Sequence, residues 1–240
     1  MFNFMRCKFS RRLGICAAAV LVVSVLPSFS QIADDAVTQG IDSSVASRDQ
    51  NVVSYSVIEH YSVFRNQDKT HPAAQMTVKT DYQRDKGKSF TVLSESGSEL
   101  IRKQVLARVF ESERTATQPA NRATALITSA NYNMQVKGHE VVDGRNCITL
   151  SIAPRRSSPY LFQGNLWVDA LDYSIVQLSG LASKSPSMLA GQTQVARHYA
   201  NFNGFPMATH ATAISTSWLL GQTTIEIEYT GYQIQVRSAH

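Results

Sequence analysis

The chain has 240 residues, of which 43% are hydrophobic and 17% charged, a composition that excludes an intrinsically disordered protein. Its 23 lysines and arginines exceed its 18 acids, giving a net charge of +5. Four of these bases lie in residues 1–30, which hold no acid, so 23 minus 4 leaves 19 bases against 18 acids in residues 31–240. This near-neutral balance lacks the basic excess of a nucleic-acid-binding protein.

Residues 1–30 are predicted to be a cleavable secretory signal peptide. The four bases precede a 14-residue apolar run at 13–26, which is short for a membrane span but typical of a signal sequence. Pro27 ends the run, and Ser28 and Ser30 supply small residues for cleavage after Ser30. The alternative is an uncleaved N-terminal anchor. Since no later segment is long and apolar enough to span a bilayer, we expect a mature protein without a membrane span in the bacterial periplasm.

The cysteines agree with a simple exported domain. Two of the three cysteines lie in the signal peptide, so the mature chain retains only Cys147 and forms no internal disulfide. A lone thiol in an oxidising compartment is safest when buried, and the apolar neighbours Ile148 and Leu150 predict such a position.

The first half of the mature chain is predicted to contain strands and one clear helix. Residues 32–46 form a short amphipathic helix. Residues 97–114 form the longer mid-chain helix, because Ile101, Val105, Leu106, Val109 and Phe110 fall on one helical face. Pro119 opens a break or a short helical turn. The strands predicted in this half are residues 52–64, 76–83 and 89–94.

From residue 130 onward almost everything is predicted to be strand and turn. Asp143-Gly144 is a hairpin signal, and the apolar alternation shifts phase at Gly231, which indicates a β-bulge. About ten strands with short connections predict a curved antiparallel sheet. We therefore expect a mainly β (α+β) fold, with residues 31–240 as a single domain. The strands predicted in this half are residues 132–137, 148–152, 160–169, 173–178, 194–202, 207–218 and 223–236.

The sequence contains no recognised catalytic, cofactor-binding or metal-binding motif. The six histidines show no metal-ligand spacing, although His198 and His210 could approach each other across a hairpin. Asp169 and Asp172 are predicted to be turn-forming residues rather than a glycosidase pair. We predict no cofactor and no enzymatic activity; the alternative, an exported hydrolase, would need a site assembled from scattered Ser, His and Asp residues.

Apolar residues cluster on both faces of residues 160–169 and again near residue 218. Strands that are apolar on both faces are either covered on both sides, or line an apolar cavity with one face. The helix at 97–114 is then either ordinary core packing or the lid over a lipid-like ligand. Phe162 and Leu166 share one strand face and Trp167 lies on the other, so at most one of these sets faces a cavity. The candidate lipid-binding residues are Phe162, Leu166, Trp167, Trp218 and Leu220.

Three segments resemble a known family: residues 138–150 (GHEVVDGRNCITL), 164–169 (GNLWVD) and 172–176 (DYSIV). Together with the order of predicted elements, they resemble the LolA/LolB-type outer-membrane lipoprotein-sorting proteins and the N-terminal domain of RseB. The resemblance implies an unclosed antiparallel barrel, with the N-terminal and mid-chain helices as a lid. It also implies an apolar cavity for the acyl chains of lipids or lipoproteins, and membrane-bound donor and acceptor proteins as partners.

The sequence differs from the LolB and RseB members of this family in two respects. A LolB-like protein would carry a lipidated cysteine at the end of the apolar run, but Cys16 lies inside it. An RseB-like protein would continue into a second domain, whereas few residues follow Val236. We therefore expect a LolA-like periplasmic carrier. The alternative is an RseB-like sensor or structural module that binds proteins, for example through a sheet edge, without a transport role.

Overall fold

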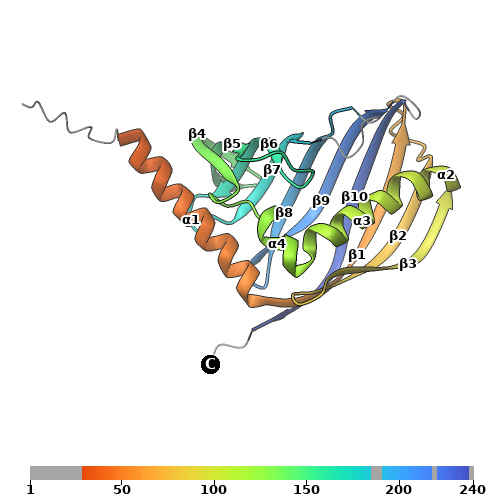
Figure 1. The fold of residues 1–240 in the computed structure, drawn as a ribbon, viewed down its shortest axis with the longest axis horizontal. Coiled ribbons are helices and arrows are strands. Elements are labelled where there is room, and N and C mark those ends of the chain that lie inside the picture. The colour runs from red at the N-terminus through yellow and green to blue at the C-terminus, as the bar shows by residue number, and fades with distance from the viewer. Residues whose placement is uncertain (1–28, 185–190, 218–220, 238–240) are drawn as a thin grey trace, which may run out of the picture.

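Ten strands form one antiparallel sheet in the computed structural model, which describes residues 29–184, 191–217 and 221–237. The strand order is β3-β2-β1-β10-β9-β8-β7-β6-β5-β4, with β3 and β4 as its two unpaired edges. The prediction of a mainly β fold with an unclosed antiparallel barrel is thus confirmed (Figure 1). The strands are β1 (Val52–Arg65), β2 (Ala74–Gln83), β3 (Gly87–Gly97), β4 (Tyr132–Val142), β5 (Arg145–Pro154), β6 (Phe162–Asp169), β7 (Ile175–Ala182), β8 (Gln194–Phe202), β9 (Phe205–Ser217) and β10 (Gly221–Val236).

Helices lie on the concave side of this sheet (Figure 1). The N-terminal helix α1 (Phe29–Asn51) extends past both ends of the predicted range. The predicted mid-chain helix is a continuous helical segment of α2 (Glu99–Ile101), a π-helical turn η1 (Arg102–Leu106) and α3 (Ala107–Thr117). After a break, α4 (Pro119–Ala125) begins with proline, which suits the first helical turn. Among the described helices, none is both long and apolar enough to cross a membrane.

Local sequence signals set the turns that shape the sheet. Asp143 and Gly144 have φ values of 49° and 76°, as a two-residue hairpin turn between β4 and β5 requires. The register of β1 against β10 shifts between the pairs Ser56–Gln233 and Ile58–Thr230, so the irregularity contains Gly231. The β-bulge predicted at this glycine is therefore confirmed.

The buried core is divided into three clusters rather than one. The first joins β4–β7 to Ile41 of α1. The second joins β1, β2, β9 and β10 to Ile101 and Leu106 of the mid-chain helical segment. The third is smaller and contains Tyr55, Tyr82 and Met207. Helix α1 packs on β4–β7, and the mid-chain helical segment packs on β1, β2, β9 and β10. The middle of the concave face therefore lies between the clusters.

Close contact between Gly40 and Tyr173 holds α1 against the first of these clusters. A Cβ atom added to Gly40 would lie 2.4 Å from a ring carbon of Tyr173, which sits in the turn between β6 and β7. Tyr173 itself has a φ of 56°, so the turn fixes the position of its ring. Glycine in the middle of a helix is unfavourable by about 1 kcal/mol relative to alanine. Its presence in α1 is explained by this close approach.

We predict that Gly40→Ala destabilises the protein despite the better helix propensity of alanine. Overpacking costs about 1–3 kcal/mol, which equals or exceeds the roughly 1 kcal/mol gained in the helix. Gly138→Ala is the matched control, because no heavy atom lies within 4 Å of its added Cβ. Denaturant unfolding should show a lower midpoint for Gly40→Ala and little change for Gly138→Ala. Equal midpoints for the two variants would contradict this account of α1 packing.

Candidate functional site

A cavity of about 290 Å³ lies between the concave face of the sheet and the helices. One side of it is apolar and is formed by α1, the segment after α4, β6, β7 and β9. This apolar side lies between the first and third core clusters, where their packing ends. Its lining residues are Val45, Leu126, Ile127, Pro159, Phe162, Ile175, Leu178 and Met207.

Tyrosines form a second part of the lining. Tyr55 and Tyr82 stack with ring centroids 4.9 Å apart, and the Tyr232 hydroxyl donates to the backbone oxygen of Ala208 at 2.9 Å. Burial raises the pKa of Tyr229 and Tyr232 well above the usual value, so both phenols stay neutral. Such side chains offer a large apolar ring together with a hydroxyl, a combination common at sites that bind amphipathic molecules. The tyrosines that line the cavity are Tyr55, Tyr82, Tyr160, Tyr199, Tyr229 and Tyr232.

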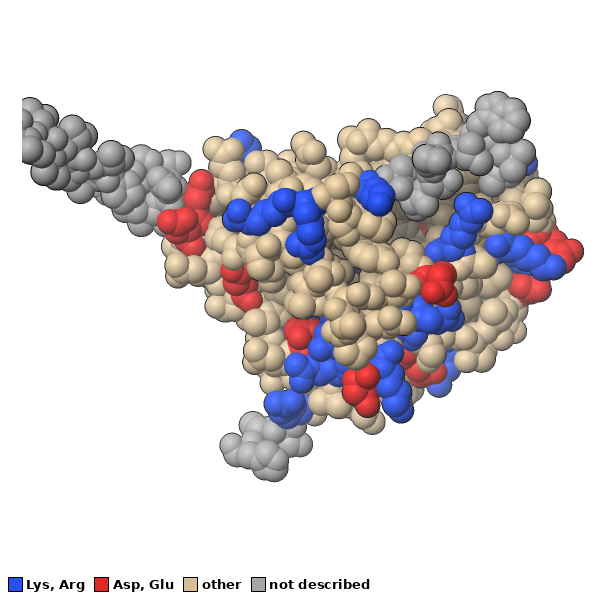
Figure 2. Space-filling view, in the orientation of Figure 1, with Lys and Arg blue, Asp and Glu red and all other residues tan. Residues whose placement is uncertain are grey.

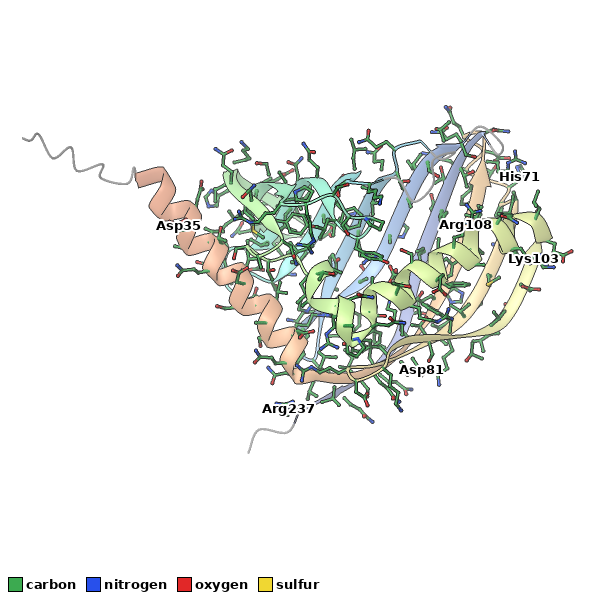
Figure 3. All side chains as sticks on the ribbon, in the orientation of Figure 1. Asp35, His71, Asp81, Lys103, Arg108 and Arg237 are labelled. Atoms are coloured by element: carbon green, nitrogen blue, oxygen red, sulfur yellow. The ribbon has the colours of Figure 1, made fainter. Side chains whose placement is uncertain are left out.

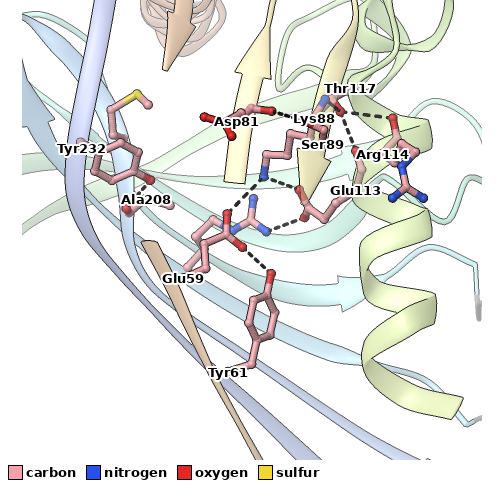
Figure 4. A network of polar contacts seen from close by, with 12 residues as sticks. Glu59, Tyr61, Asp81, Lys88, Ser89, Glu113, Arg114, Thr117, Ala208 and Tyr232 are labelled. Carbon is pink, nitrogen blue, oxygen red and sulfur yellow. Dashed lines mark hydrogen bonds and ion pairs between the residues drawn. The ribbon is translucent and has the colours of Figure 1, made fainter. Parts of the chain in front are cut away.

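A network of four charged residues forms the third part of the lining (Figure 4). Lys88 Nζ on β3 donates to Glu113 Oε2 on α3 at 2.8 Å and lies 4.0 Å from Glu59 Oε1 on β1. Arg197 Nη2 on β8 donates to the other oxygen of Glu113, Oε1, at 3.2 Å. The Tyr61 hydroxyl donates to Glu59 Oε2. Glu113 therefore connects a helix to two strands that lie far apart in the sheet.

Lys88, Glu113 and Arg197 are held in their charged forms. Burial alone would raise the pKa of Glu113. The positive charges of Lys88 and Arg197 outweigh this effect and lower the pKa to about 2. Burial lowers the pKa of Lys88, but Glu113 and other neighbours, including Glu59, leave it well above the usual value. The network therefore balances two positive against two negative charges in a partly buried position. Charges so placed are stable only as pairs, because an unpaired charge out of water costs several kcal/mol.

A second ion-pair group ties α1 to α4 at the rim of the cavity. Arg122 Nε of α4 lies 2.8 Å from Asp49 Oδ1 of α1, and both side chains are 19% exposed. Arg84 Nη2, after β2, lies 3.8 Å from the other Asp49 oxygen. In addition, Arg48 Nε donates to the Pro206 oxygen on β9 at 2.9 Å. These contacts fix the C-terminal end of α1 over the sheet.

Charged side chains outside the cavity are distributed differently. Asp35, Lys103 and Arg108 project outward from the helices (Figure 3). On the face that carries the helices, acidic and basic groups are interspersed without a broad patch of one sign (Figure 2). The Lys88, Glu113 and Arg197 cluster differs because its members point into the molecule.

The structure separates the predicted lipid-binding residues. Phe162 lines the cavity, and Leu166 is fully buried in the first core cluster on the same strand face. Trp167 points to the opposite face of the sheet, where its indole Nε1 donates to Glu140 Oε2 at 2.7 Å. The strand-face ambiguity is thus resolved: the face with Phe162 and Leu166 is turned toward the helices. Trp218 and Leu220 lie outside the described residues.

The structure also places the two histidines, the two aspartates and the cysteine that the sequence singled out. His198 and His210 do face each other across β8 and β9, with ring centroids 6.5 Å apart. Within residues 29–184, 191–217 and 221–237, no three metal-ligating side chains are grouped to hold an ion. Asp169 Oδ2 accepts from Arg145 Nε at 2.8 Å, and Asp172 Oδ1 accepts from the Ser174 backbone at 2.9 Å. Cys147 is 1% exposed, and burial raises its pKa.

The charged residues of the cavity were missed by the sequence analysis. One signal was available at Glu59, which interrupts the inward-facing alternation of Tyr55, Val57, Tyr61 and Val63 along β1. A single carboxylate on an otherwise apolar strand face predicts a buried partner. The partners themselves come from β3, β8 and α3, so the network follows only from the strand order and register.

This geometry defines a class of protein in which an open antiparallel sheet holds a cavity beneath covering helices. Among similar solved structures is a LolA superfamily protein from Nitrosomonas europaea (12% identity, 85% of this chain and 94% of that chain, TM-score 0.43). An outer membrane lipoprotein-sorting protein domain from Vibrio parahaemolyticus is also similar (11% identity, 87% and 95%, TM-score 0.45). So is the MucA/MucB complex of Pseudomonas aeruginosa (11% identity, 84% and 100%, TM-score 0.26). At these identities the likeness is one of fold. No family model and no curated protein matches the chain.

The charged network predicts a specific loss of stability in acid. Since the pKa of Glu113 is about 2 in the folded protein, against an ordinary value of 4.5, its ion pairs stabilise the fold fully above about pH 4.5. That contribution is lost progressively as the pH falls toward 2, because the unfolded state binds the proton first. Glu113→Gln should lack this part of the acid dependence in urea unfolding measured between about pH 6 and pH 3.

Glu111→Gln is the control for this experiment. It removes a carboxylate from the same helix, where Glu111 pairs with Arg114 on the exposed surface at 2.7 Å. This variant should keep the wild-type acid dependence, because exposed pairs contribute little to stability. Identical pH profiles for Glu113→Gln and the wild type would show that the buried pairs do not stabilise the fold.

Proposed function

We propose that the protein is a non-enzymatic carrier in the bacterial periplasm that binds an acyl chain of a lipid or acylated lipoprotein in the cavity under its helices. In this proposal residues 1–30 are removed as a signal peptide and residues 31–240 form one carrier domain. The observation that carries it is the cavity of about 290 Å³ between an unclosed sheet and the helices. Ligand sites in proteins are typically concave, mostly apolar and about 300–1,000 Å³ in volume.

Burial of the chain supplies the binding energy in this mechanism. A methylene group needs about as much room as a water molecule, roughly 30 Å³, so the cavity has space for about ten. Each buried methylene contributes about 0.8 kcal/mol, or about 8 kcal/mol for ten before the costs of association are subtracted. A single chain held in this way binds reversibly, as an exchange between carrier and membrane requires.

The helices control access to the cavity. Glu113 holds α3 to Lys88 and Arg197, and Asp49 holds α1 to Arg122. These are polar contacts at the rim and wall of the cavity, which break with less loss of packing than a continuous apolar core. Small movements of α3 and α4 would admit and release the chain without any covalent step. Membrane-bound donor and acceptor proteins would supply and receive the cargo.

A sheet edge favours a second candidate, a module that binds another envelope protein. Strand β3 is an edge of the sheet, and its Val92 and Leu93 are 50% and 55% exposed. An extended peptide pairing with such an edge is a common mode of recognition. However, the β2–β3 register shifts between the pairs Thr77–Ser94 and Val78–Val92, so Leu93 lies in a bulge. Bulges interrupt regular pairing along an edge, and the carrier is therefore preferred.

Native mass spectrometry of the protein purified from the bacterial periplasm tests the proposal directly. We expect a discrete adduct that extracts into organic solvent as a lipid or an acylated peptide, and its mass identifies the class of cargo. A mass without adduct, together with no uptake of a fluorescent fatty acid, would reject the carrier and favour the protein-binding module.

Filling part of the cavity should weaken uptake. Ala116 on α3 lines the cavity, and Ala116→Phe places a ring where two or more methylenes of the ligand would lie. Losing two methylenes costs about 1.6 kcal/mol, so the affinity for a fluorescent fatty acid should fall at least about tenfold. Ala107→Phe, the same substitution at an exposed position of α3, should bind as the wild type does. Equal affinities for both variants would place the bound chain elsewhere.

A further inference from the structure

The charged network lies inside a cavity proposed for an acyl chain, and ion pairs are not needed to hold such a chain. This inference rests on the proposed function and specifies the ligand for the same cavity. We propose that the ligand is a single-chain amphiphile with an anionic head, a carboxylate or a phosphate. The head replaces the Glu113 carboxylate between Lys88 and Arg197.

The two cations are carried by strands of the sheet, whereas their carboxylate partner is carried by a helix. Lys88 pairs with Tyr82 of β2, and Arg197 pairs with Leu178 of β7 and Ala211 of β9, so the sheet holds both backbones. Glu113 comes from α3, and its side chain is 27% exposed. Rotation of this side chain toward solvent would free Lys88 and Arg197 together. The second carboxylate, Glu59, is 1% exposed and accepts the Tyr61 hydroxyl, so it stays in place.

Arg197 offers more hydrogen bonds than Glu113 uses. Its Nη2 donates to Glu113 Oε1, while its Nε is buried without a hydrogen-bond partner. A guanidinium group binds a carboxylate or phosphate best through two parallel donors, here Nε and Nη2. An anionic head that engages both donors would bind Arg197 more completely than Glu113 does.

The charge of the cavity favours an anion over a cation or a neutral head. Among the described lining residues, four basic side chains face three acidic ones. Exchanging Glu113 for the head of a ligand keeps this balance, because one negative charge leaves as another enters. A cationic head would instead be repelled by the basic groups. The basic lining residues are Arg48, Lys88, Arg122 and Arg197, and the acidic ones are Asp49, Glu59 and Glu113.

The volume of the cavity favours one chain. Space for about ten methylenes matches a single medium-length chain. The charged network would take the head, and the chain would lie along apolar lining residues such as Phe162 and Ile175.

Three probes with the same dodecyl group separate the head from the tail: tridecanoate, dodecyl phosphate and dodecanol. Displacement of a bound fluorescent fatty acid from the full mature chain gives their affinities. We expect both anionic probes to bind the wild type at least about tenfold more tightly than dodecanol, since hydrogen bonds to charged groups have this effect. The preference between carboxylate and phosphate then identifies the head.

Variants of the network place the effect at these residues. Arg197→Met should weaken the anionic probes at least about tenfold and leave dodecanol within about threefold. Glu113→Gln should strengthen the anionic probes, because it removes the competing carboxylate. Arg108→Met is the control: this side chain is exposed on α3 (Figure 3), and its loss should change no affinity.

Each outcome bears on one of the two proposals. Equal binding of all three probes to the wild type and to Arg197→Met would overturn the anionic head while leaving the acyl-chain carrier in place. Failure of all three probes to bind the wild type would reject the carrier itself. If Arg197→Met does not fold, Glu113→Gln decides the question, and an unchanged or weaker affinity for the anionic probes would overturn the exchange with Glu113.

Discussion

The pairing of β1 with β10 is the interaction on which the rest of the structure depends. It joins the three N-terminal strands to the seven-strand meander β4–β10, and among the described strands no other ladder connects the two parts. The register runs from Val52–Val236 to Arg65–Thr223 and passes through the bulge at Gly231. Since these residues are distant in the chain, forming this ladder carries the loop-closure entropy of a long connection. The mid-chain helices connect the two parts and therefore cross the hollow that the pairing creates.

The hollow follows from the shape of the sheet. A ten-stranded sheet curves, and the helices on its concave face are too few to fill that face with one continuous core. Helix α1 completes the cluster with Ile41, and the mid-chain segment completes the cluster with Leu106. Between them lies the strip of β1, β8, β9 and β10 that carries Glu59 and Arg197. Its polar residues do not extend the apolar core, and their charges are held there as pairs.

Much of this fold could be predicted from local signals, and the site could not. Residues 194–202 form β8 as predicted, and the turn at Asp143 and the bulge at Gly231 follow from glycine and aspartate preferences. The end of α1 was placed too early, because its polar last turn lacks apolar periodicity and is held by tertiary contacts of Arg48. The charged network joins four elements, so it depends on strand order, which periodicity does not determine. Of the three predicted site residues that the structure describes, Phe162 lines the cavity, because its strand face was apolar enough to stand out.

Strands β6 and β7 approach each other closely at two glycines, which have no side chains. Gly164 of β6 lies directly opposite Gly180 of β7. A Cβ at Gly164 would be 2.2 Å from the Ser179 oxygen, and one at Gly180 would be 2.5 Å from the Gln163 oxygen. The two strands therefore approach more closely here than side chains would allow. Beside these strands the cavity is lined by both apolar and charged side chains, so its lining offers contacts to a hydrocarbon chain and to a polar group.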